Sequence, residues 1–314
     1  MNLLINIPIN LVVSVGFGLL EAGIVSLKNE TNIMLKNIAD IVFGGFTYWI
    51  FGYGITYGTW RGSSSIFGFG LYAVDADIPG MGDLFTNFFF QLSFATTATT
   101  IVSGAVAERC NYKAYCLYSF VATVTYCVAA RWVWGPDGWL QRLGAIDIAG
   151  SGVVHLTGGS AALVAAWFIG PRLGRFETGP PPWGNPTGAF IGTLTLWWAW
   201  LAFNAGSTFG LTQGLWKFAA RACVTTMVAS IAGGMIGMLW AFIKPGKVFE
   251  PGIPVNAILG ALVSVTAGCA IMHTPEAFGA GAIGAVLVLL ADQLTQLAKI
   301  DDAVGATAVH GKEL

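Results

Sequence analysis

The chain has 314 residues and a formal net charge of −1, and 55% of its residues are hydrophobic while only 10% are charged. Soluble domains carry about 25% charged residues, so this composition excludes an ordinary soluble protein and indicates an integral membrane protein in a lipid bilayer. Runs such as GAIGAVLVLLA at 281–291 are continuously apolar, which excludes the alternating pattern of a membrane β-barrel. We expect no nucleic acid among its partners.

Ten segments of the chain are apolar over roughly the 20 residues that a membrane-spanning helix needs. In chain order they cover residues 3–27, 38–60, 84–107, 113–134, 147–170, 187–206, 218–243, 253–272, 277–298 and 303–314. The last of them is too short to cross a bilayer. The 42 glycines suit helices in lipid, where small residues let backbones approach closely. The sequence therefore predicts an all-α polytopic membrane protein with one membrane domain over residues 1–314.

The basic residues are shared unequally between the two sets of loops. Most of them, such as Lys28, Arg109 and Arg172, lie in connections that follow odd-numbered segments. Because loops rich in Lys and Arg stay on the cytoplasmic side, we expect the amino terminus outside. The five cysteines include no CxxC pair and lie mostly inside predicted segments, so they are interpreted as small hydrophobic residues.

One motif is written twice. It occurs in DIAGSGVVHL, which begins at Asp147 and contains His155, and in DDAVGATAVHG, where Asp302 precedes His310. In both copies Gly stands at the third position after the aspartate, Val at the seventh and His at the eighth. The histidines lie in the fifth and tenth segments, and an odd number of crossings means that the second copy enters the membrane in the opposite direction. This is the signature of an inverted-topology repeat.

The repeat predicts two inverted halves of five segments each, at about residues 1–172 and 173–314. Elements related by an axis in the membrane plane meet near the midplane, so we expect the two histidines to face each other there. An aspartate inside a membrane is unfavourable by about 2.5–3.5 kcal/mol and is usually functional. Asp147 stands where its segment begins, which suits an N-cap, a source of negative potential for a cation, or both. Asp302 lies at a loop edge, where capping and function are both open.

Three chemistries use a pair of facing imidazoles. Metal ligation needs three or four ligands, and no third ligand lies at a suitable spacing near either histidine, so we expect no metal. Hydrolysis needs an activated nucleophile, and Ser151 and Thr157 flank the site without a nucleophile motif. We favour a pore lined by neutral imidazoles. These rings donate and accept hydrogen bonds, so they suit the passage of a small neutral polar molecule better than that of a full cation. Aromatic faces outside it would recruit the cation.

Several further motifs occur in order along nearly the whole chain. They are TNIMLKN, IVSGAVAERC and WAWLAFNAGS, together with the two histidine motifs. In this set the chain resembles the ammonium transporter family, and its eukaryotic-type branch most closely. The resemblance implies a transporter rather than an enzyme, without a cofactor, in the plasma membrane. It also implies an eleven-span fold, a homotrimer, and one pore per subunit built from two inverted five-helix halves.

The resemblance assigns roles to particular residues. Ammonium would dock by cation–π contact and a hydroxyl hydrogen bond, lose its proton near a gate, and continue as ammonia past the histidines. The implied substrate site consists of Trp134, Phe90, Ser207 and Asp147, the gate of Phe94 and Phe203, and the pore-lining proton relay of His155 and His310.

Two alternatives and one departure from the family pattern accompany this prediction. A Rhesus-type ammonia gas channel shares the histidines, although Ser207 and Trp134 favour the ammonium-selective branch. An ammonium sensor without substantial flux is the second alternative, and a long cytoplasmic tail would favour it.

The family's tenth span continues past the second histidine and an eleventh follows, whereas this sequence stops at Leu314. We therefore expect a carboxyl-terminal truncation, with about ten spans and the last incomplete.

Overall fold

The computed structural model describes residues 2–243 and 249–311, with side chains from residue 12 onwards, and this part of the chain is helical without any strand. The longer helices are α1 (Asn2–Ile24), α2 (Glu30–Ala39), α5 (Ile78–Ala105), α6 (Tyr112–Trp134), α8 (Thr157–Ile169), α9 (Pro186–Gly206), α10 (Trp216–Ile243), α11 (Gly252–Thr266) and α12 (Thr274–Leu297). The short helices are α3 (Gly45–Thr47), α4 (Tyr53–Tyr57), α7 (Trp139–Arg142) and α13 (Ala306–His310). A 3₁₀ turn forms η1 (Leu27–Asn29), and π-helical turns form η2 (Asp40–Gly44), η3 (Tyr48–Gly52) and η4 (Ser151–Leu156).

Five helical stretches in the described ranges are long and apolar enough to cross a membrane by length and composition. They are Leu27–Tyr57, Tyr112–Arg142, Ser151–Ile169, Trp216–Ile243 and Thr274–Leu297. Shorter apolar helices lie at Val12–Ile24 and Gly252–Thr266. Every apolar segment of the sequence overlaps at least one helix, and the chain is an all-α polytopic membrane protein, as predicted.

The second predicted segment was placed too late in the chain. The helical stretch that contains it begins at Leu27 and includes TNIMLKN, whereas the prediction began at residue 38. The polar side chains of Lys36 and Asn37 lower the local hydropathy, yet both are buried between helices. Hydropathy measures suitability for lipid, so it does not detect a helix whose polar face is turned inward.

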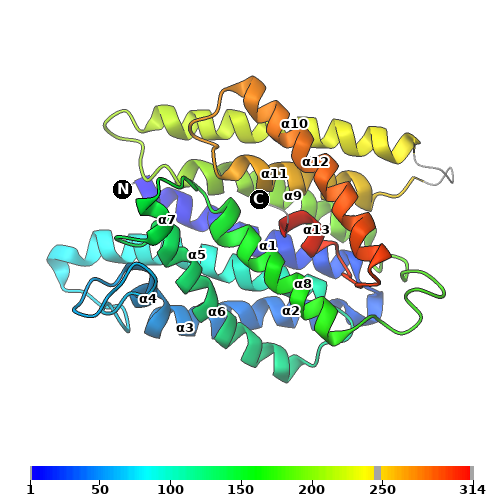
Figure 1. The fold of residues 1–314 in the computed structure, drawn as a ribbon, viewed down its shortest axis with the longest axis horizontal. Helices are drawn as coiled ribbons and strands as arrows, with labels where there is room; N and C mark the ends of the chain where they lie inside the picture. The colour runs from blue at the N-terminus through cyan, green and yellow to red at the C-terminus, as the bar shows by residue number, and fades with distance from the viewer. Residues whose placement is uncertain (1, 244–248, 312–314) are drawn as a thin grey trace.

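Long helices run side by side along the bundle (Figure 1). Helices α1 and α9 pack along each other, α10, α11 and α12 pack together beside them, and α2 to α4 lie with α5 and α6. The contact between α1 and α9 is close because of small residues: a methyl group at Gly192 would collide with the backbone of Leu20. Figure 1 shows the short helix α13 in the interior of the bundle, where it contacts α8, α11 and α12.

A buried arginine fixes the loop between α4 and α5. Arg131, near the end of α6, is only 2% exposed, and its guanidinium donates to the carbonyl oxygens of Thr56, Gly58 and Ser64 at 2.9–3.1 Å. A buried cation must be compensated by hydrogen bonds, and three carbonyl groups supply them here. The loop is thereby held against the end of α6, next to Trp134.

Candidate functional site

The first copy of the repeated motif is a helix start capped by its aspartate. Oδ1 of Asp147 accepts the backbone N–H groups of Gly150 and Ser151 at 2.8 and 2.9 Å, and Oδ2 accepts those of Gly152 and Val153 at 2.8 and 2.9 Å. One carboxylate thus satisfies four of the donors that a helix leaves unpaired at its start, and its charge opposes the positive helix end.

The second copy has the same local structure. Asp302 accepts the N–H groups of Val304 and Gly305 at 3.3 and 3.0 Å on Oδ1 and that of Thr307 at 2.5 Å on Oδ2. Gly150 and Gly305 occupy equivalent places with φ of +94° and +79°, a left-handed conformation that glycine adopts without strain. The spacing from Asp to Gly in both copies is therefore that of a capped helix start.

The two starts bring the histidines together. The rings of His155 and His310 lie 5.0 Å apart between centroids and nearly parallel, at 15°, and they are 1% and 3% exposed. Helices α8 and α13 can approach because position 159 is glycine: a methyl group there would collide with the backbone of His310 and Gly311. Among residues 2–243 and 249–311, no group of three His, Cys, Asp or Glu side chains could hold a metal ion.

Aromatic side chains that were not predicted from the sequence surround the histidines. Trp200 stacks on His155 with centroids 4.8 Å apart at 16°, and its indole N–H donates to Thr266 Oγ1 at 2.8 Å. On the other side, Phe17 lies 5.9 Å from His310. Neither ring nitrogen of His155 makes a hydrogen bond to any described residue. The imidazole of His155 is therefore positioned by ring packing, which leaves its nitrogens available to a small polar guest.

The predicted gate residues lie in contact. The rings of Phe94 and Phe203 are 4.5 Å apart and tilted by 52°, and each side chain is 1% exposed. Phe203 also lies 6.0 Å from His155. On its other side Phe94 contacts Phe90 at 4.9 Å and Trp134 at 5.5 Å, both edge to face. A continuous series of buried ring contacts therefore leads from Trp134 to the histidine pair.

A cavity of about 350 Å³ opens beyond the phenylalanines. Phe90, Phe94, Trp134 and Ser207, which are predicted site residues, all line it. The Ser207 hydroxyl donates to the Phe203 carbonyl at 2.8 Å, so its oxygen is free to accept. Aromatic faces and a hydroxyl acceptor are the groups that bind an ammonium-type cation.

The same cavity contains residues that sequence reasoning missed. Phe209 lies 5.6 Å from Phe90. Asn87, Gln91 and Gln141 add polar groups to the lining, and the Tyr57 hydroxyl makes no hydrogen bond to a described residue. Only Phe209 had a sequence signal, since it follows the FNAGS motif by two positions. The others come from helices whose contacts the sequence alone does not specify.

Asp147 lies beside this cavity rather than in its lining. Its backbone oxygen accepts the Trp134 indole N–H at 2.6 Å, while both carboxylate oxygens are turned to the start of η4. The aspartate thus orients Trp134 and the turn that carries His155 without touching the cavity. Its side chain is a helix cap, one of the two roles that the sequence left open.

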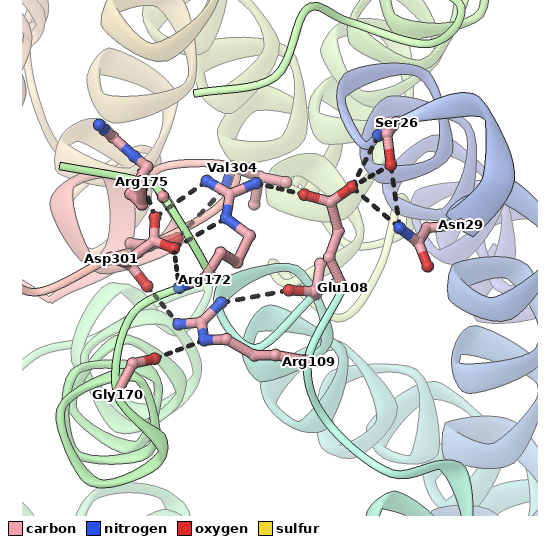
Figure 2. A network of polar contacts seen from close by, with 12 residues as sticks. Ser26, Asn29, Glu108, Arg109, Gly170, Arg172, Arg175, Asp301 and Val304 are labelled. Atoms are coloured by element: carbon pink, nitrogen blue, oxygen red, sulfur yellow. Dashed lines mark hydrogen bonds and ion pairs between the residues drawn. The ribbon is translucent and has the colours of Figure 1, made fainter. Parts of the chain in front are cut away.

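A charged cluster joins the loops that follow α5 and α8 to the loop before α13 (Figure 2). Arg172, in the loop between α8 and α9, bridges Asp301 at 2.7 Å and Glu108 at 2.5 Å. Arg175 reaches Asp301 at 3.2 Å, and Arg109 donates to the Gly170 carbonyl at 2.7 Å and to the Asp301 carbonyl. Three loops that are distant in sequence meet here, next to the Asp302 cap.

The carboxylates of this charged cluster are held in their ionised form. Burial by itself would raise the pKa of Asp301, but the guanidinium of Arg172 more than offsets it and holds the pKa below its usual range. Burial would likewise raise the pKa of Glu108, but hydrogen bonds from Ser26 and Arg172 lower it below its ordinary value. The cluster therefore ties the loop before His310 to the rest of the protein by charge.

The fold and the site define a polytopic helical membrane protein with an internal path of aromatic and imidazole rings between a cavity and a charged cluster. The sequence model of the Ammonium Transporter Family matches residues 3–313, and the chain belongs to this family. Its members are transporters, not enzymes.

Proteins with similar sequences come from distant organisms. A Caenorhabditis elegans protein provisionally named ammonium transporter 3 is 42% identical over 305 residues, which are 94% of this chain and 44% of that protein. The ammonium transporter Amt2 of Archaeoglobus fulgidus is 36% identical over 312 residues, 94% of this chain and 65% of its own length. The chain thus spans about half the length of the C. elegans relatives, at 44% and 59%.

Solved structures share the fold. A protein described as Sensor Amt Protein superimposes with a TM-score of 0.89 at 30% identity, over 98% of this chain and 78% of its own. Mep2 of Candida albicans does so with a TM-score of 0.85 at 26% identity, over 98% of this chain and 70% of its own.

Proposed function

We propose that this chain conducts ammonium across a membrane through a twin-histidine pore. Ammonium binds in the 350 Å³ cavity and transfers a proton to the imidazoles of His155 and His310, which form a proton relay. The ammonia that remains passes Phe94 and Phe203 and moves along the same two histidines. The observation that carries the proposal is the parallel pair of imidazoles, 5.0 Å apart, directly behind the phenylalanines. Membership of the Ammonium Transporter Family supports the choice of substrate.

The cavity has the chemistry to select ammonium before conduction. The rings of Phe90 and Trp134 offer negative faces, worth about 0.5–2 kcal/mol for a nearby cation. The hydroxyl oxygens of Ser207 and Tyr57 can accept N–H groups, since Ser207 donates its own proton to a carbonyl. Potassium carries the same charge as ammonium but has no N–H group to donate, so hydrogen bonds to these oxygens favour ammonium. Asp147 contributes indirectly, by holding Trp134.

Deprotonation follows from the nature of the path behind the cavity. Between the outer cavity and the histidines the ring contacts leave no group that could replace the water around a full cation, and transfer of such an ion is strongly unfavourable. Ammonia is neutral and can pass with a few hydrogen bonds. The nitrogens of His155 have no partner among the described residues, so they can accept or donate as the guest passes.

The charged cluster supports an orientation with the cavity outside. The cavity contacts α5 near Phe90, and the helix ends at Ala105, about 22 Å further along at 1.5 Å per residue, just before Glu108. Arg109, Arg172 and Arg175 gather at this second end, which suits the cytoplasmic side. The cavity and the amino terminus then lie outside. We further propose the plasma membrane, a homotrimer, and two inverted halves that meet at the histidines.

The test is ammonium uptake with and without the histidines. Cells lacking their own ammonium uptake would express two forms: the 314-residue chain, and a chimera continued after Leu314 with the corresponding end of the C. elegans relative. We expect growth on limiting ammonium and a saturable ammonium-evoked current, both lost on His155→Ala with His310→Ala. The matched control is His273→Asn. It changes the one histidine of the sequence outside the pair, which is exposed and is the N-cap residue of α12. Uptake that survives the double substitution, or no uptake by either correctly inserted form, contradicts the proposal.

A sensor is the second candidate, because a protein described as Sensor Amt Protein has the same fold. Ammonium binding near Trp134 should change tryptophan fluorescence in either case. A saturable fluorescence change without uptake or current would favour the sensor. Uptake without current would instead favour a Rhesus-type channel for neutral ammonia.

A further inference from the structure

A small cavity lies on the inner side of the histidine pair. It has a volume of about 20 Å³, and its polar lining consists of His310, Glu21 and Asn256. A water molecule needs roughly 10–15 Å³ and two to four polar partners. This cavity satisfies both conditions, so it has room for one water between an imidazole and a carboxyl group.

Glu21 has one anchored oxygen and one that faces this space. The side chain, on α1, is 2% exposed, and Oε2 accepts Asn37 Nδ2 at 2.9 Å and the Ser103 hydroxyl. Oε1 accepts no hydrogen bond from any residue of the described chain, and a methyl group added at Gly104 would lie 3.0 Å from it. The carboxyl group is thus held at one end and open at the other.

Other charged groups near Glu21 lie behind it rather than in the cavity. Lys36 and Asp40, from α2 and η2, are buried beside it, and Lys36 lies 5.4 Å from the Tyr115 ring. Asp40 accepts the Tyr115 hydroxyl at 2.9 Å. Neither group lines the cavity. Glu21 is therefore the one carboxyl, within the described ranges, that shares this space with a pore histidine.

One wall of the cavity is formed by a residue near the charged cluster. Val304 lines it and lies beside the charged cluster in Figure 2, in the loop that follows Asp301 and Asp302. Its side chain is partly exposed. A proton that reaches Glu21 is thus one loop away from the cytoplasmic side of the proposed orientation.

We propose that Glu21 is the inner proton acceptor of the histidine pair, an inference that rests on the proposed conduction of ammonia. An N–H bond of a His310 imidazolium breaks as an O–H bond of the cavity water forms, and that water transfers another proton to Oε1 of Glu21. The histidine becomes neutral, the carboxylate becomes a carboxylic acid, and no electrons are transferred. Ammonia and the proton then leave by separate steps, and their sum carries one positive charge inward.

The experiment compares current with uptake in the same voltage-clamped oocytes, using labelled methylammonium and a series of external pH values. Three variants are used: Glu21→Gln, which keeps an acceptor for Asn37 and Ser103, Glu21→Asp, which keeps the acid, and Asp40→Asn. The last is the matched control, because Asp40 is an equally buried carboxyl outside the cavity. Surface protein is measured for each.

We expect Glu21→Gln to lower the current per methylammonium taken up by about 100-fold, the size of a lost proton-transfer group, and to flatten its pH dependence. Uptake of the neutral form continues, Glu21→Asp recovers part of the current, and Asp40→Asn keeps the wild-type ratio. An unchanged ratio of current to uptake in Glu21→Gln overturns the proposal. This holds even if current and uptake both fall, because a purely structural role would lower the two together. Wild-type uptake without current overturns the relay alone, and wild-type protein with neither overturns the proposed function itself.

Discussion

The two histidines occupy the same local structure but are held in place by different forces. His155 follows the Asp147 cap on a π-helical turn, η4, that continues into α8, and it stacks on Trp200. His310 follows the Asp302 cap at the end of the short helix α13, next to a loop tied down by charges. Repetition in the sequence thus specifies the helix start, while the surroundings decide how firmly each ring is fixed.

The difference is already visible at the caps. The Asp147 carboxylate accepts four backbone N–H groups and that of Asp302 accepts three. Only the first aspartate also accepts an indole through its backbone oxygen. The second has a neighbour instead, Asp301, which binds Arg172. The first histidine should therefore respond most to changes in packing and capping, and the second to changes in charge.

The largest effect is expected for Arg172→Ala. It leaves the Asp301 carboxylate buried without its main partner, a change that lowers the free energy of unfolding by about 3–5 kcal/mol in comparable buried pairs. The loss should appear as a lower Tm in detergent and, through the loop before His310, as a lower ammonium current.

The control for this prediction is Arg142→Ala, because Arg142 pairs with Asp137 at 3.3 Å in an exposed position. Exposed pairs contribute little, so its Tm should not change measurably. A double substitution, Arg172→Ala with Asp301→Ala, should destabilise less than the sum of the single ones. Additive losses would show that the two side chains act independently.

Removal of the caps should have the next largest effect. Asp147→Ala leaves four N–H groups at a buried helix start without their partner, and we expect a loss of about 2–4 kcal/mol. Asp302→Ala should be milder, because one of its three hydrogen bonds is 3.3 Å long. Thermal unfolding of both variants measures the difference. Equal losses would mean that the two helix starts are equivalent and that the comparison between them fails.

A smaller effect is expected from acid. The pKa values of Asp301 and Glu108 are held below their ordinary values in the folded protein. Their ionised forms therefore stabilise the fold fully above the unfolded-state pKa values of about 3.9 and 4.3, and this stabilisation is lost as the pH falls through the lower folded values. Tm measured from pH 3 to 7 should decline at the acidic end.

Substitution of Asp301 by Asn isolates this contribution. Asp301→Asn should lower Tm at neutral pH and make its decline at acidic pH shallower, because one of the two titrating groups is gone. An acid decline as steep as that of the wild-type protein would assign the effect to other carboxyl groups.

The sequence predicted the features that depend on local pattern. Every apolar segment found by hydropathy overlaps a helix, although the second began too late, and the repeated motif located both capped helix starts. The motifs also singled out Phe90, Trp134 and Ser207, which do line one cavity. These features were accessible because a cap, a helix or a family motif is written within a few neighbouring residues.

The features that depend on packing were not predicted. The stack of Trp200 on His155 and the contact of Phe17 with His310 join helices far apart in the chain. The Arg172 cluster joins three loops, and Glu21 was hidden in an apolar segment because a single acid barely changes hydropathy. Such contacts are determined by the relative rotation of helices, which periodicity in a uniformly apolar span does not reveal.

The smallest effect separates the aromatic neighbours of the two histidines. Trp200→Phe removes a hydrogen bond to Thr266 and much of a parallel stack at 4.8 Å, together worth about 1–2 kcal/mol. Phe17→Leu removes only a tilted contact at 5.9 Å and keeps most of the apolar volume, so its effect should be smaller. Because His155 is positioned by ring packing, Trp200→Phe should lower the ammonium current more than it lowers Tm, whereas Phe17→Leu should leave both near wild type. A larger loss of current for Phe17→Leu would mean that His310, despite its charged anchor, also depends on its aromatic neighbour.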